Sequence, residues 1–198
     1  MKILLFIPAR GGSKGIINKN LYEIAGKKLI QYTIDIALEL EAKSNQEVQW
    51  IPFLSSNDKK IIDYCSNNGL RTDYKRPENL SRDDSSIIDA IFDALKWQEE
   101  RDGLPDLIIT LQPTSPIRPK NMIFNGIQKL KKNKNFQNLV HLEKTSYKVG
   151  SLSKKKEWEP LYDFTVRGQD INNQFRPSGC LFLYLRKDFE NYRKFIKR

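Results

Sequence analysis

The segment Ile3-Leu-Leu-Phe-Ile-Pro-Ala-Arg-Gly-Gly-Ser-Lys-Gly-Ile-Ile-Asn-Lys-Asn20 carries the features that decide the fold. Its first five residues are all apolar, which is typical of a fully buried strand. Three glycines then follow among Arg10, Lys14 and Lys19. Glycine lets a backbone turn tightly and approach a ligand, while neighbouring cations attract an anion. The segment predicts a strand followed by a polyphosphate-binding loop, with a solvated strand-to-helix loop as the alternative.

The composition indicates a single globular domain. The chain has 198 residues, of which 39% are hydrophobic, enough for one sizeable core. No apolar run approaches the roughly 20 residues that a membrane helix needs. The first apolar run is also too short for a signal peptide. We therefore expect no membrane partner and a cytoplasmic location.

The formal net charge of +10 favours anionic partners such as nucleotides, acidic sugars or nucleic acid. Part of the excess lies in the run 154–156 and beyond residue 186. Nucleic acid is the less favoured partner, because the chain has no zinc spacing and no RNA-binding aromatic signature. Cys65 and Cys180 are expected to be reduced and structural. His141 is the only histidine, which excludes sites built on several histidines, and it reads as a strand residue.

Apolar runs alternate with segments of helical period, which indicates an open α/β sheet, mostly parallel, with helices on both faces. Helices are expected at 29–40, 59–67, 121–131 and 188–196. A further helix, the third in chain order, is expected after Asp83 or Asp84, with apolar residues at helical spacing over 87–95 and its end at Gly103 and Pro105. Strands are expected at 3–7, 47–54, 70–74, 106–111, 138–142 and 180–185. Asp58 is the expected cap of the second helix, and Asp83 or Asp84 that of the third. Pro52 interrupts the second strand, because proline removes a ladder donor. The polar stretch 145–176 breaks the alternation and predicts an excursion from the sheet.

Two loops are expected where ligands bind in such a sheet, beyond the carboxyl ends of its strands. The first is 10–20, and the second is the proline-rich loop 112–119. The first loop does not match the ATPase pattern GxxxxGK[ST], because Lys14 and Gly15 stand in the wrong order. It does not match GxGxxG either. A standard ATPase loop and a dinucleotide fingerprint are therefore disfavoured.

Residues 7–15 and 18–20 resemble the nucleotide loop of the cytidylyltransferases that activate nonulosonic acids, the CMP-N-acetylneuraminic acid synthetase family. Leu111-Gln-Pro-Thr-Ser-Pro-Ile-Arg118 is similar to the second signature of that family. Shorter similarities follow in the family's order at 54–58, 76–80, 83–85 and 175–179, so the resemblance covers residues 1 to about 185. It implies a Rossmann-like nucleotide-diphospho-sugar transferase fold and a homodimer. It also implies transfer of CMP from CTP to the anomeric hydroxyl of a sialic-type sugar acid, with release of pyrophosphate.

The resemblance also implies roles for individual residues. Arg10 and Lys19 match the family's phosphate-contacting, catalytic cations. The residues expected to bind the nucleotide are Ala9, Gly11, Gly12, Ser13, Asn20, Arg76, Ser85 and Gln112. The residues expected to bind the sugar are Gln112, Lys148 (reaching from the partner subunit), Arg176 and Ser178. From the residues alone, Ser85 and Ser86 fit helix caps equally well, and Lys148 fits a solvated charge.

The sequence departs from the family pattern at Ile17, Gly168, Asn172 and Ser178, which leaves the sugar open. The resemblance implies Mg²⁺ as cofactor, yet the chain ends without the family's closing segment and its two metal-binding aspartates. Asp58 is a conceivable replacement, and the metal ligands stay unassigned. The alternatives are a different keto-sugar acid as acceptor, a nucleotide-binding protein with impaired catalysis, or a basic nucleic-acid-binding module.

Overall fold

The computed structural model describes residues 1–13, 15–133, 135, 137–145, 147, 150–161, 165, 167 and 174–189. The chain forms two compact units. Unit 1 comprises Met1–Val140 and Gly179–Arg198, and unit 2 comprises His141–Ser178. Within the described ranges, no helix is both long and apolar enough to cross a membrane.

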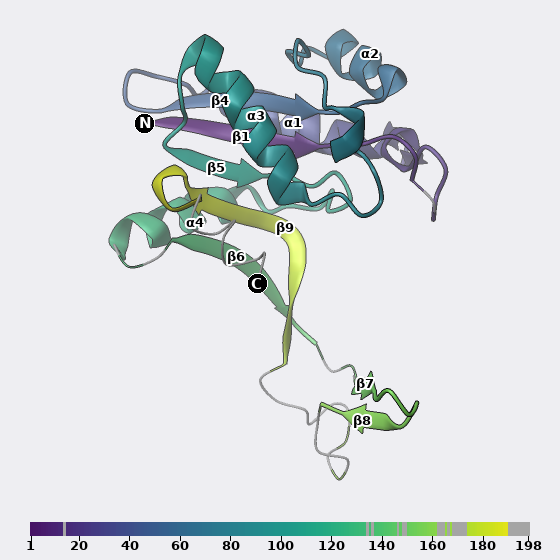
Figure 1. Cartoon of the computed structure of the whole chain (residues 1–198). Coiled ribbons are helices and arrows are strands. Elements are labelled where there is room, and N and C mark those ends of the chain that lie inside the picture. The colour runs from purple at the N-terminus through teal and green to yellow at the C-terminus, as the bar shows by residue number, and fades with distance from the viewer. Residues whose placement is uncertain are drawn as a thin grey trace. The chain divides into compact units, whose positions relative to one another are not determined.

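A five-stranded sheet with the order β4-β1-β5-β9-β6 is the main architectural element (Figure 1). Its strands are β1 (Lys2–Pro8), β4 (Gln49–Ser55), β5 (Leu107–Thr110), β6 (Asn138–Lys144) and β9 (Phe175–Leu185). β1 pairs in parallel with both β4 and β5, whereas β9 pairs antiparallel with β5. The predicted open and mostly parallel α/β sheet is confirmed.

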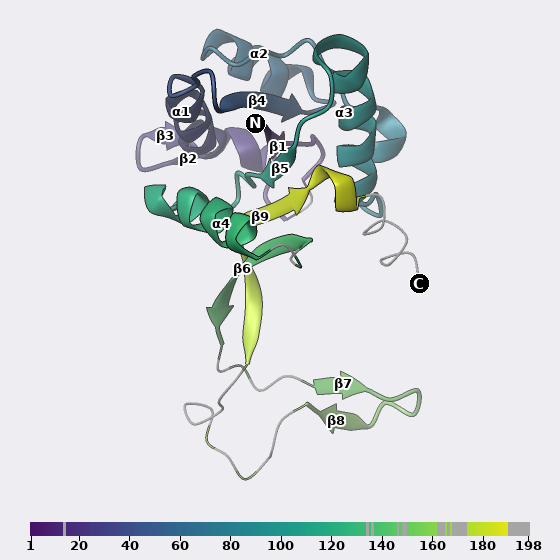
Figure 2. The same cartoon turned by 90° about the vertical axis from the view of Figure 1, so that its left-hand side faces the viewer.

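Helices cover both faces of the sheet, as predicted (Figure 2). α1 (Leu29–Glu41), α2 (Lys59–Asn67) and α4 (Lys120–Lys132) contribute to one core cluster, and α3 (Ile87–Asp102) to the other. Successive side chains of a strand point to opposite faces. Accordingly Ile3, Leu5 and Ile7 join the first cluster, while Leu4 and Phe6 join the second. This is why β1 is apolar at every position from Ile3 to Ile7.

Short elements connect the layers. They are the 3₁₀ turns η1 (Lys19–Leu21) and η2 (Glu78–Leu80) and the strand pair β2 (Glu23–Ile24) and β3 (Lys27–Lys28). Unit 2 contains an antiparallel strand pair, β7 (Gly150–Leu152) and β8 (Trp158–Pro160). His141 lies in β6, as predicted. Cys65 and Cys180 are not in a disulfide, in agreement with the predicted reduced state.

Pro52 lies inside β4, opposite Leu5 of β1. β4 is the last strand at one side of the sheet, so one of its edges has no neighbouring strand among the described residues. A proline in an edge strand is tolerated where its missing N–H would face away from the ladder. The position of β4 in the sheet therefore reconciles Pro52 with the strand.

Two predictions about local structure are wrong. Residues 70–74 form no strand: Leu70 and Tyr74 are buried, but the backbone between them is irregular. Arg71 and Asp73 between them are exposed and form an ion pair. The segment therefore buries two apolar side chains without pairing as a strand. The cap of α3 is Ser86, whose Oγ accepts from the N–H of Ile88, and neither Asp83 nor Asp84. The helix predicted at 188–196 lies largely outside the described residues, which are helical at 186–189.

Asp58 caps α2, as its sequence position predicts. Its carboxylate accepts from the N–H of Lys60 at 2.8 Å and from that of Ile61 at 3.4 Å. We expect Asp58→Ala to lower the free energy of unfolding by about 1 kcal/mol, because two amide donors of the first turn lose their acceptor. Urea denaturation measures this change.

The control for this variant is Asp63→Ala on the same helix, which removes only an exposed pair with Lys59. Such i,i+4 pairs contribute about 0.3–0.5 kcal/mol. Equal losses from the two variants would contradict the capping role of Asp58.

Candidate active site

The connectivity of the sheet places a crevice at the end of β1. The chain passes from β1 through α1 to β4 on one side, and then through α3 to β5 on the other side of β1. α1 and α3 cover opposite faces. The loops that follow β1 and β5 therefore diverge, and in open α/β sheets such a switch point is where ligands bind.

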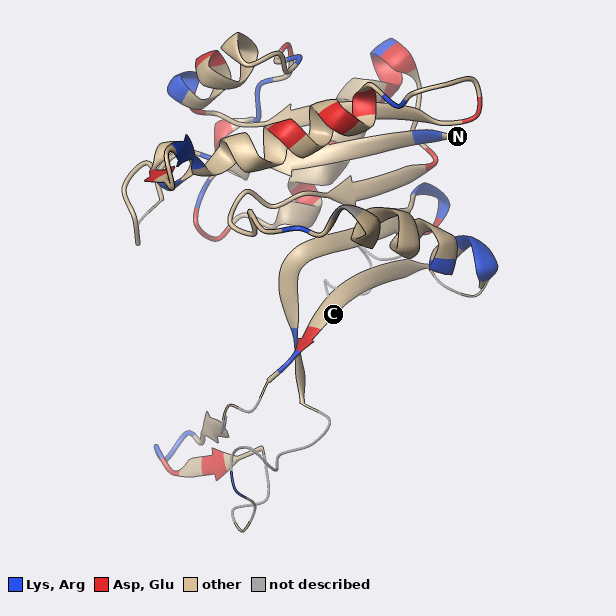
Figure 3. Cartoon of the chain, turned by 180° about the vertical axis from the view of Figure 1, so that it is seen from behind, with Lys and Arg blue, Asp and Glu red and all other residues tan. Residues whose placement is uncertain are grey.

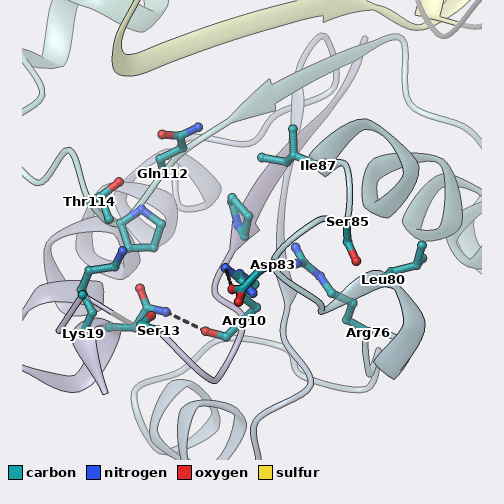
Figure 4. Close-up of a pocket in the computed structure, with 14 residues that line it drawn as sticks. Arg10, Ser13, Lys19, Arg76, Leu80, Asp83, Ser85, Ile87, Gln112 and Thr114 are labelled. Carbon is teal, nitrogen blue, oxygen red and sulfur yellow. Dashed lines mark hydrogen bonds and ion pairs between the residues drawn. The ribbon is translucent and has the colours of Figure 1, made fainter. Parts of the chain in front are cut away.

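A pocket of about 480 Å³ lies at this point in unit 1 (Figure 4). Its lining comprises Pro8, Arg10, Ser13, Gly15, Lys19, Asn20, Arg76, Leu80, Asp83, Ser85, Ile87, Gln112, Pro113 and Thr114. Lys19, Ser13 and Thr114 lie on one side, and Arg76, Leu80 and Ser85 on the other. Three of the lining side chains are cationic and one is a carboxylate, so the pocket suits an anionic ligand.

Arg10 is held by the loop that precedes α3. Its guanidinium donates to Asp83 Oδ1 at 2.7 Å and to the carbonyl oxygen of Ser81 at 3.1 Å. About a third of the Arg10 side chain stays exposed, at 34%. Arg10 is therefore oriented at the pocket while its charge remains accessible to a ligand.

Side-chain amides fix the backbone on either side of Arg10. Asn20 donates to the carbonyl oxygen of Arg10 at 3.2 Å. The amide N–H of Gly11 donates to Asn57 Oδ1 at 3.0 Å, and Asn57 in turn donates to Glu78. These bonds hold the turn after β1 in one conformation, which reduces the entropy that a bound ligand would have to remove.

Arg76 is the most buried cation of the pocket, with 5% of its surface exposed. Its Nε donates to Ser55 Oγ at 2.9 Å, whereas Nη2 is buried and has no hydrogen-bond partner among the described residues. Burial lowers the pKa of Arg76 to about 10. The guanidinium therefore stays charged at neutral pH. A buried donor without an acceptor is costly, and an anionic or carbonyl oxygen in the pocket would satisfy it.

Lys19 and Ser85 differ in how strongly the protein holds them. Lys19 forms no ion pair within the described part of the chain. Ser85 Oγ accepts from the N–H of Arg82 and donates to the carbonyl oxygen of Asn79. Ser85 thus stabilises the loop before α3 and also lines the pocket. Its neighbour Ser86 caps α3, a role that the sequence alone allowed for either serine.

The loop after β5 is attached to β9 by Arg118. This side chain is 6% exposed and donates to the carbonyl oxygens of Cys180 at 2.5 Å and Gln112 at 3.2 Å. Gly179 lies under the same loop, where a Cβ would stand 2.7 Å from Ser115 Oγ and 3.2 Å from Gln112 Oε1. The Gln112 side chain therefore rests on the backbone of β9.

Seven of the predicted nucleotide and catalytic residues line one pocket: Arg10, Ser13, Lys19, Asn20, Arg76, Ser85 and Gln112. Ala9 is buried and does not line it. Gly11 and Gly12 line a small adjacent hollow instead. The structure adds Asp83 to this lining, although its sequence position predicts a helix cap. Arg118, at the end of the second signature, does not line the pocket but holds the loop of Gln112 in place. The structural role of Arg118 becomes visible only through the burial of its charged side chain, which no local sequence pattern predicts.

The residues predicted to bind the sugar belong mostly to unit 2. Arg176 pairs with Glu143, and its guanidinium stacks over Tyr147 with 5.3 Å to the ring centroid. Ser178 Oγ lies 2.7 Å from His141 Nδ1. Lys148, Gly168 and Asn172 lie outside the described residues. The sugar-binding roles stay predictions.

Asp83 and Asp58 differ in how well they fit Mg²⁺. Within the described residues, no three Asp, Glu, His or Cys side chains gather into a metal-binding group. Mg²⁺ commonly needs only one or two carboxylates besides substrate phosphates and water. Asp83 in the pocket fits that requirement. Asp58 fits it less well, because its carboxylate caps α2 and does not line the pocket.

Solved structures with the same arrangement are nucleotidyltransferases. The structure of CMP:2-keto-3-deoxy-manno-octonic acid synthetase complexed with CTP aligns with a TM-score of 0.66 at 19% identity, over 98% of this chain and 78% of that one. The 4-diphosphocytidyl-2C-methyl-D-erythritol synthase of Anaerococcus prevotii aligns with a TM-score of 0.62 at 16% identity, over 99% and 77%. At these identities the likeness establishes the fold, which is that of the nucleotidyltransferases.

The sequence defines the family within this fold. A family model described as cytidylyltransferase matches residues 4–198, and the chain belongs to the cytidylyltransferase family. It is 29% identical to pseudaminic acid cytidylyltransferase of Campylobacter jejuni, over 96% of this chain and 83% of the relative. It is 35% identical to CMP-N,N'-diacetyllegionaminic acid synthase of Legionella pneumophila, over 65% and 53%. N-acylneuraminate cytidylyltransferase of Streptococcus agalactiae is 26% identical, over 99% and 46%.

The contact between β9 and the loop after β5 can be tested at Gly179, whose φ is +79°. An alanine there would be strained by its backbone conformation and would also collide with Ser115. We expect Gly179→Ala to destabilise the protein by more than the ~1–2 kcal/mol that left-handed backbone costs a side chain. Urea denaturation measures the loss.

Two glycine controls separate the causes. Gly26→Ala carries a similar φ of +75° with nothing within 4 Å of the new Cβ, so it reports backbone strain alone. Gly15→Ala has neither the strain nor the contact and should be close to neutral. If Gly179→Ala lowered the free energy of unfolding no more than Gly26→Ala does, the contact between Gly179 and the loop would not contribute to stability.

Proposed function

We propose that this chain transfers CMP from CTP to the anomeric hydroxyl of a nonulosonic acid and releases pyrophosphate. The observation that carries the proposal is the pocket itself. It brings Arg10 and Lys19 from the loop after β1, Arg76 from the loop preceding η2, and Gln112 from the loop after β5 to one cavity. Membership of the cytidylyltransferase family and the names of the relatives support the nucleotide and the acceptor class.

The chemistry assigns the cations a role. The anomeric oxygen forms a bond to the α-phosphorus while the bond to pyrophosphate breaks, and negative charge grows on the phosphoryl oxygens and the leaving group. Preorganised cations and N–H donors stabilise such charge without further reorganisation. Arg10, already oriented by its two hydrogen bonds, and Lys19, which lies on the side of Ser13 and Thr114, supply this positive charge.

The remaining lining residues position the two substrates. Arg76, with its unpartnered Nη2, and Ser85 hold the nucleotide on the side of the loop before α3. Gln112 lies at the other loop and contacts the acceptor. Arg176, Ser178 and Lys148 are proposed to bind the acidic sugar, Lys148 from the partner subunit. Mg²⁺, when bound with CTP, would neutralise phosphate charge, and Asp83 is the lining residue that can hold it.

The distribution of charge argues against a nucleic-acid-binding module. Acidic residues lie along α1, while basic residues occupy the last turn of α4 at Lys129, Lys131 and Lys132 (Figure 3). Nucleic-acid binding requires a continuous basic face that follows the phosphate backbone. The cations of the pocket are instead arranged around a cavity the size of a small molecule.

The decisive experiment measures pyrophosphate release from CTP and Mg²⁺ with a panel of nonulosonic acids and other keto-sugar acids. We expect turnover with at least one nonulosonic acid. Arg10→Ala and Lys19→Ala should each lower kcat/KM by about 10²–10³, the usual effect of removing one transition-state donor. Lys59→Ala is the matched control, because Lys59 is an exposed cation on α2 and outside the pocket.

Each other outcome favours a different alternative. Turnover with another keto-sugar acid, and with no nonulosonic acid, would indicate that the enzyme uses that other acid as its acceptor. Saturable CTP binding without turnover on any acceptor would indicate a nucleotide-binding protein with impaired catalysis. Tight RNA binding that weakens steeply with salt, in the absence of CTP binding, would refute the transferase proposal.

We further propose that the chain forms a homodimer through unit 2. Large apolar side chains are exposed on the described residues of this unit, at 48–69% of their surface: Leu142, Tyr147, Leu152, Trp158, Leu161 and Phe175. Apolar exposure concentrated in so short a segment is typical of a protein interface. A second copy is the occupant that the family resemblance implies.

The dimer proposal predicts the effect of two substitutions. Leu152→Asp and Leu161→Asp together should convert the dimer to a monomer in sedimentation-velocity measurements, because each would place a charge in the apolar interface. Ile24→Asp, which alters a similarly apolar and 44% exposed side chain of unit 1, should leave the dimer intact. A wild-type chain that sediments as a monomer at high concentration would exclude the dimer.

A further inference from the structure

Among the described residues that line the pocket, Asp83 is the only carboxylate. It lies on the loop between η2 and α3, and 43% of its side chain is exposed. Its Oδ1 accepts from Arg10 Nη2 at 2.7 Å. The cation that the proposed reaction directs at phosphate is therefore engaged by a carboxylate in the nucleotide-free protein.

A carboxylate in this position conflicts with the proposed substrate. CTP brings a polyphosphate of several negative charges, and like charges close together in a pocket repel each other. Asp83 and the phosphates also require the same guanidinium. When the phosphates engage Arg10, the carboxylate that held it faces the incoming anion. A divalent cation resolves the conflict, since it attracts the carboxylate and the phosphate oxygens together.

We propose that Asp83 exchanges partners on substrate binding: it releases Arg10 to the phosphates and becomes a carboxylate ligand of the Mg²⁺ that accompanies CTP. This inference rests on the proposed cytidylyltransferase function and names the metal ligand of that site. Mg²⁺ is suited to such a site, because it keeps several waters and takes one or two carboxylates beside substrate phosphates.

The neighbouring carboxylates have other roles. Asp58 caps α2, and Glu78 accepts a hydrogen bond from Asn57. Asp84 follows Asp83 directly but does not line the pocket. Asp83 is thus the carboxylate that combines access to the cavity with a partner that the substrate displaces.

Calorimetric titration with CTP in the absence of acceptor tests the exchange without any catalytic turnover. CTP is titrated once in EDTA and once in saturating Mg²⁺, and the ratio of the two dissociation constants reports the coupling between metal and nucleotide. We expect Mg²⁺ to tighten CTP binding to the wild-type chain by a factor in the usual range of about 5–150. In Asp83→Asn the ratio should fall close to 1, while binding in EDTA is retained or strengthened, because the repulsive charge is gone.

The variants are chosen to separate the possible roles of Asp83. Asp84→Asn removes the same charge from the same loop outside the pocket and should leave the ratio at its wild-type value. Asp83→Glu keeps the carboxylate and should keep a ratio well above 1. Thermal unfolding of each variant confirms that it is folded.

Two results would overturn the inference. If Asp83→Asn weakened CTP binding equally in EDTA and in Mg²⁺, Asp83 would only position Arg10. If the variant kept the wild-type ratio at unchanged affinity, Asp83 would have no part in metal binding. Failure of the wild-type chain to bind CTP under either condition would instead refute the proposed function, so the two failures are distinguishable.

Discussion

The structure depends on the burial of β1 between two parallel partners. Every side chain from Ile3 to Ile7 is fully buried, alternately against the cluster of α1, α2 and α4 and against that of α3. With both faces covered and both edges paired, β1 has a single possible position in the sheet. The loop that follows it therefore leaves from a rigid base, at the point where the chain order reverses. The crevice that holds Arg10 is a consequence of that placement.

Around this rigid base, the site is assembled by buried polar groups. Arg76 and Arg118 are both nearly inaccessible, and burial lowers the pKa of each to about 10. Arg118 donates to the carbonyl oxygens of Gln112 and Cys180, and so joins the loop after β5 to β9. Arg76 has one donor satisfied by Ser55 and another without a described partner. Nη1 of Arg118 is likewise buried without a described partner, so the two arginines differ in position: Arg76 lines the pocket, whereas Arg118 does not.

Asp83 links the two halves of the functional proposal. In the nucleotide-free chain it orients Arg10, and in the proposed complex it would hold the metal. Both roles follow from one geometric fact, which is that the loop before α3 presents a carboxylate to the same cavity as the loop after β1. Because Asp83 already lies at the cavity, it needs little rearrangement to pass from Arg10 to the proposed metal ion.

The sequence by itself determined the class of fold and the loops that form the pocket. The period of its apolar residues was sufficient for α1, α2, α4 and β1, because each buries a face whose pattern is local. Glycines and cations after an apolar strand also sufficed to locate the loop of Arg10. Only the tertiary structure decided that Pro52 lies in an edge strand, that residues 70–74 remain unpaired, and that Asp83 contacts Arg10 instead of capping α3. Arg10 and Asp83 are 73 residues apart in the chain. Which segments meet in space decides the strand order, the edge position of β4 and the ion pairs between distant loops. Local sequence periodicity does not encode these long-range contacts.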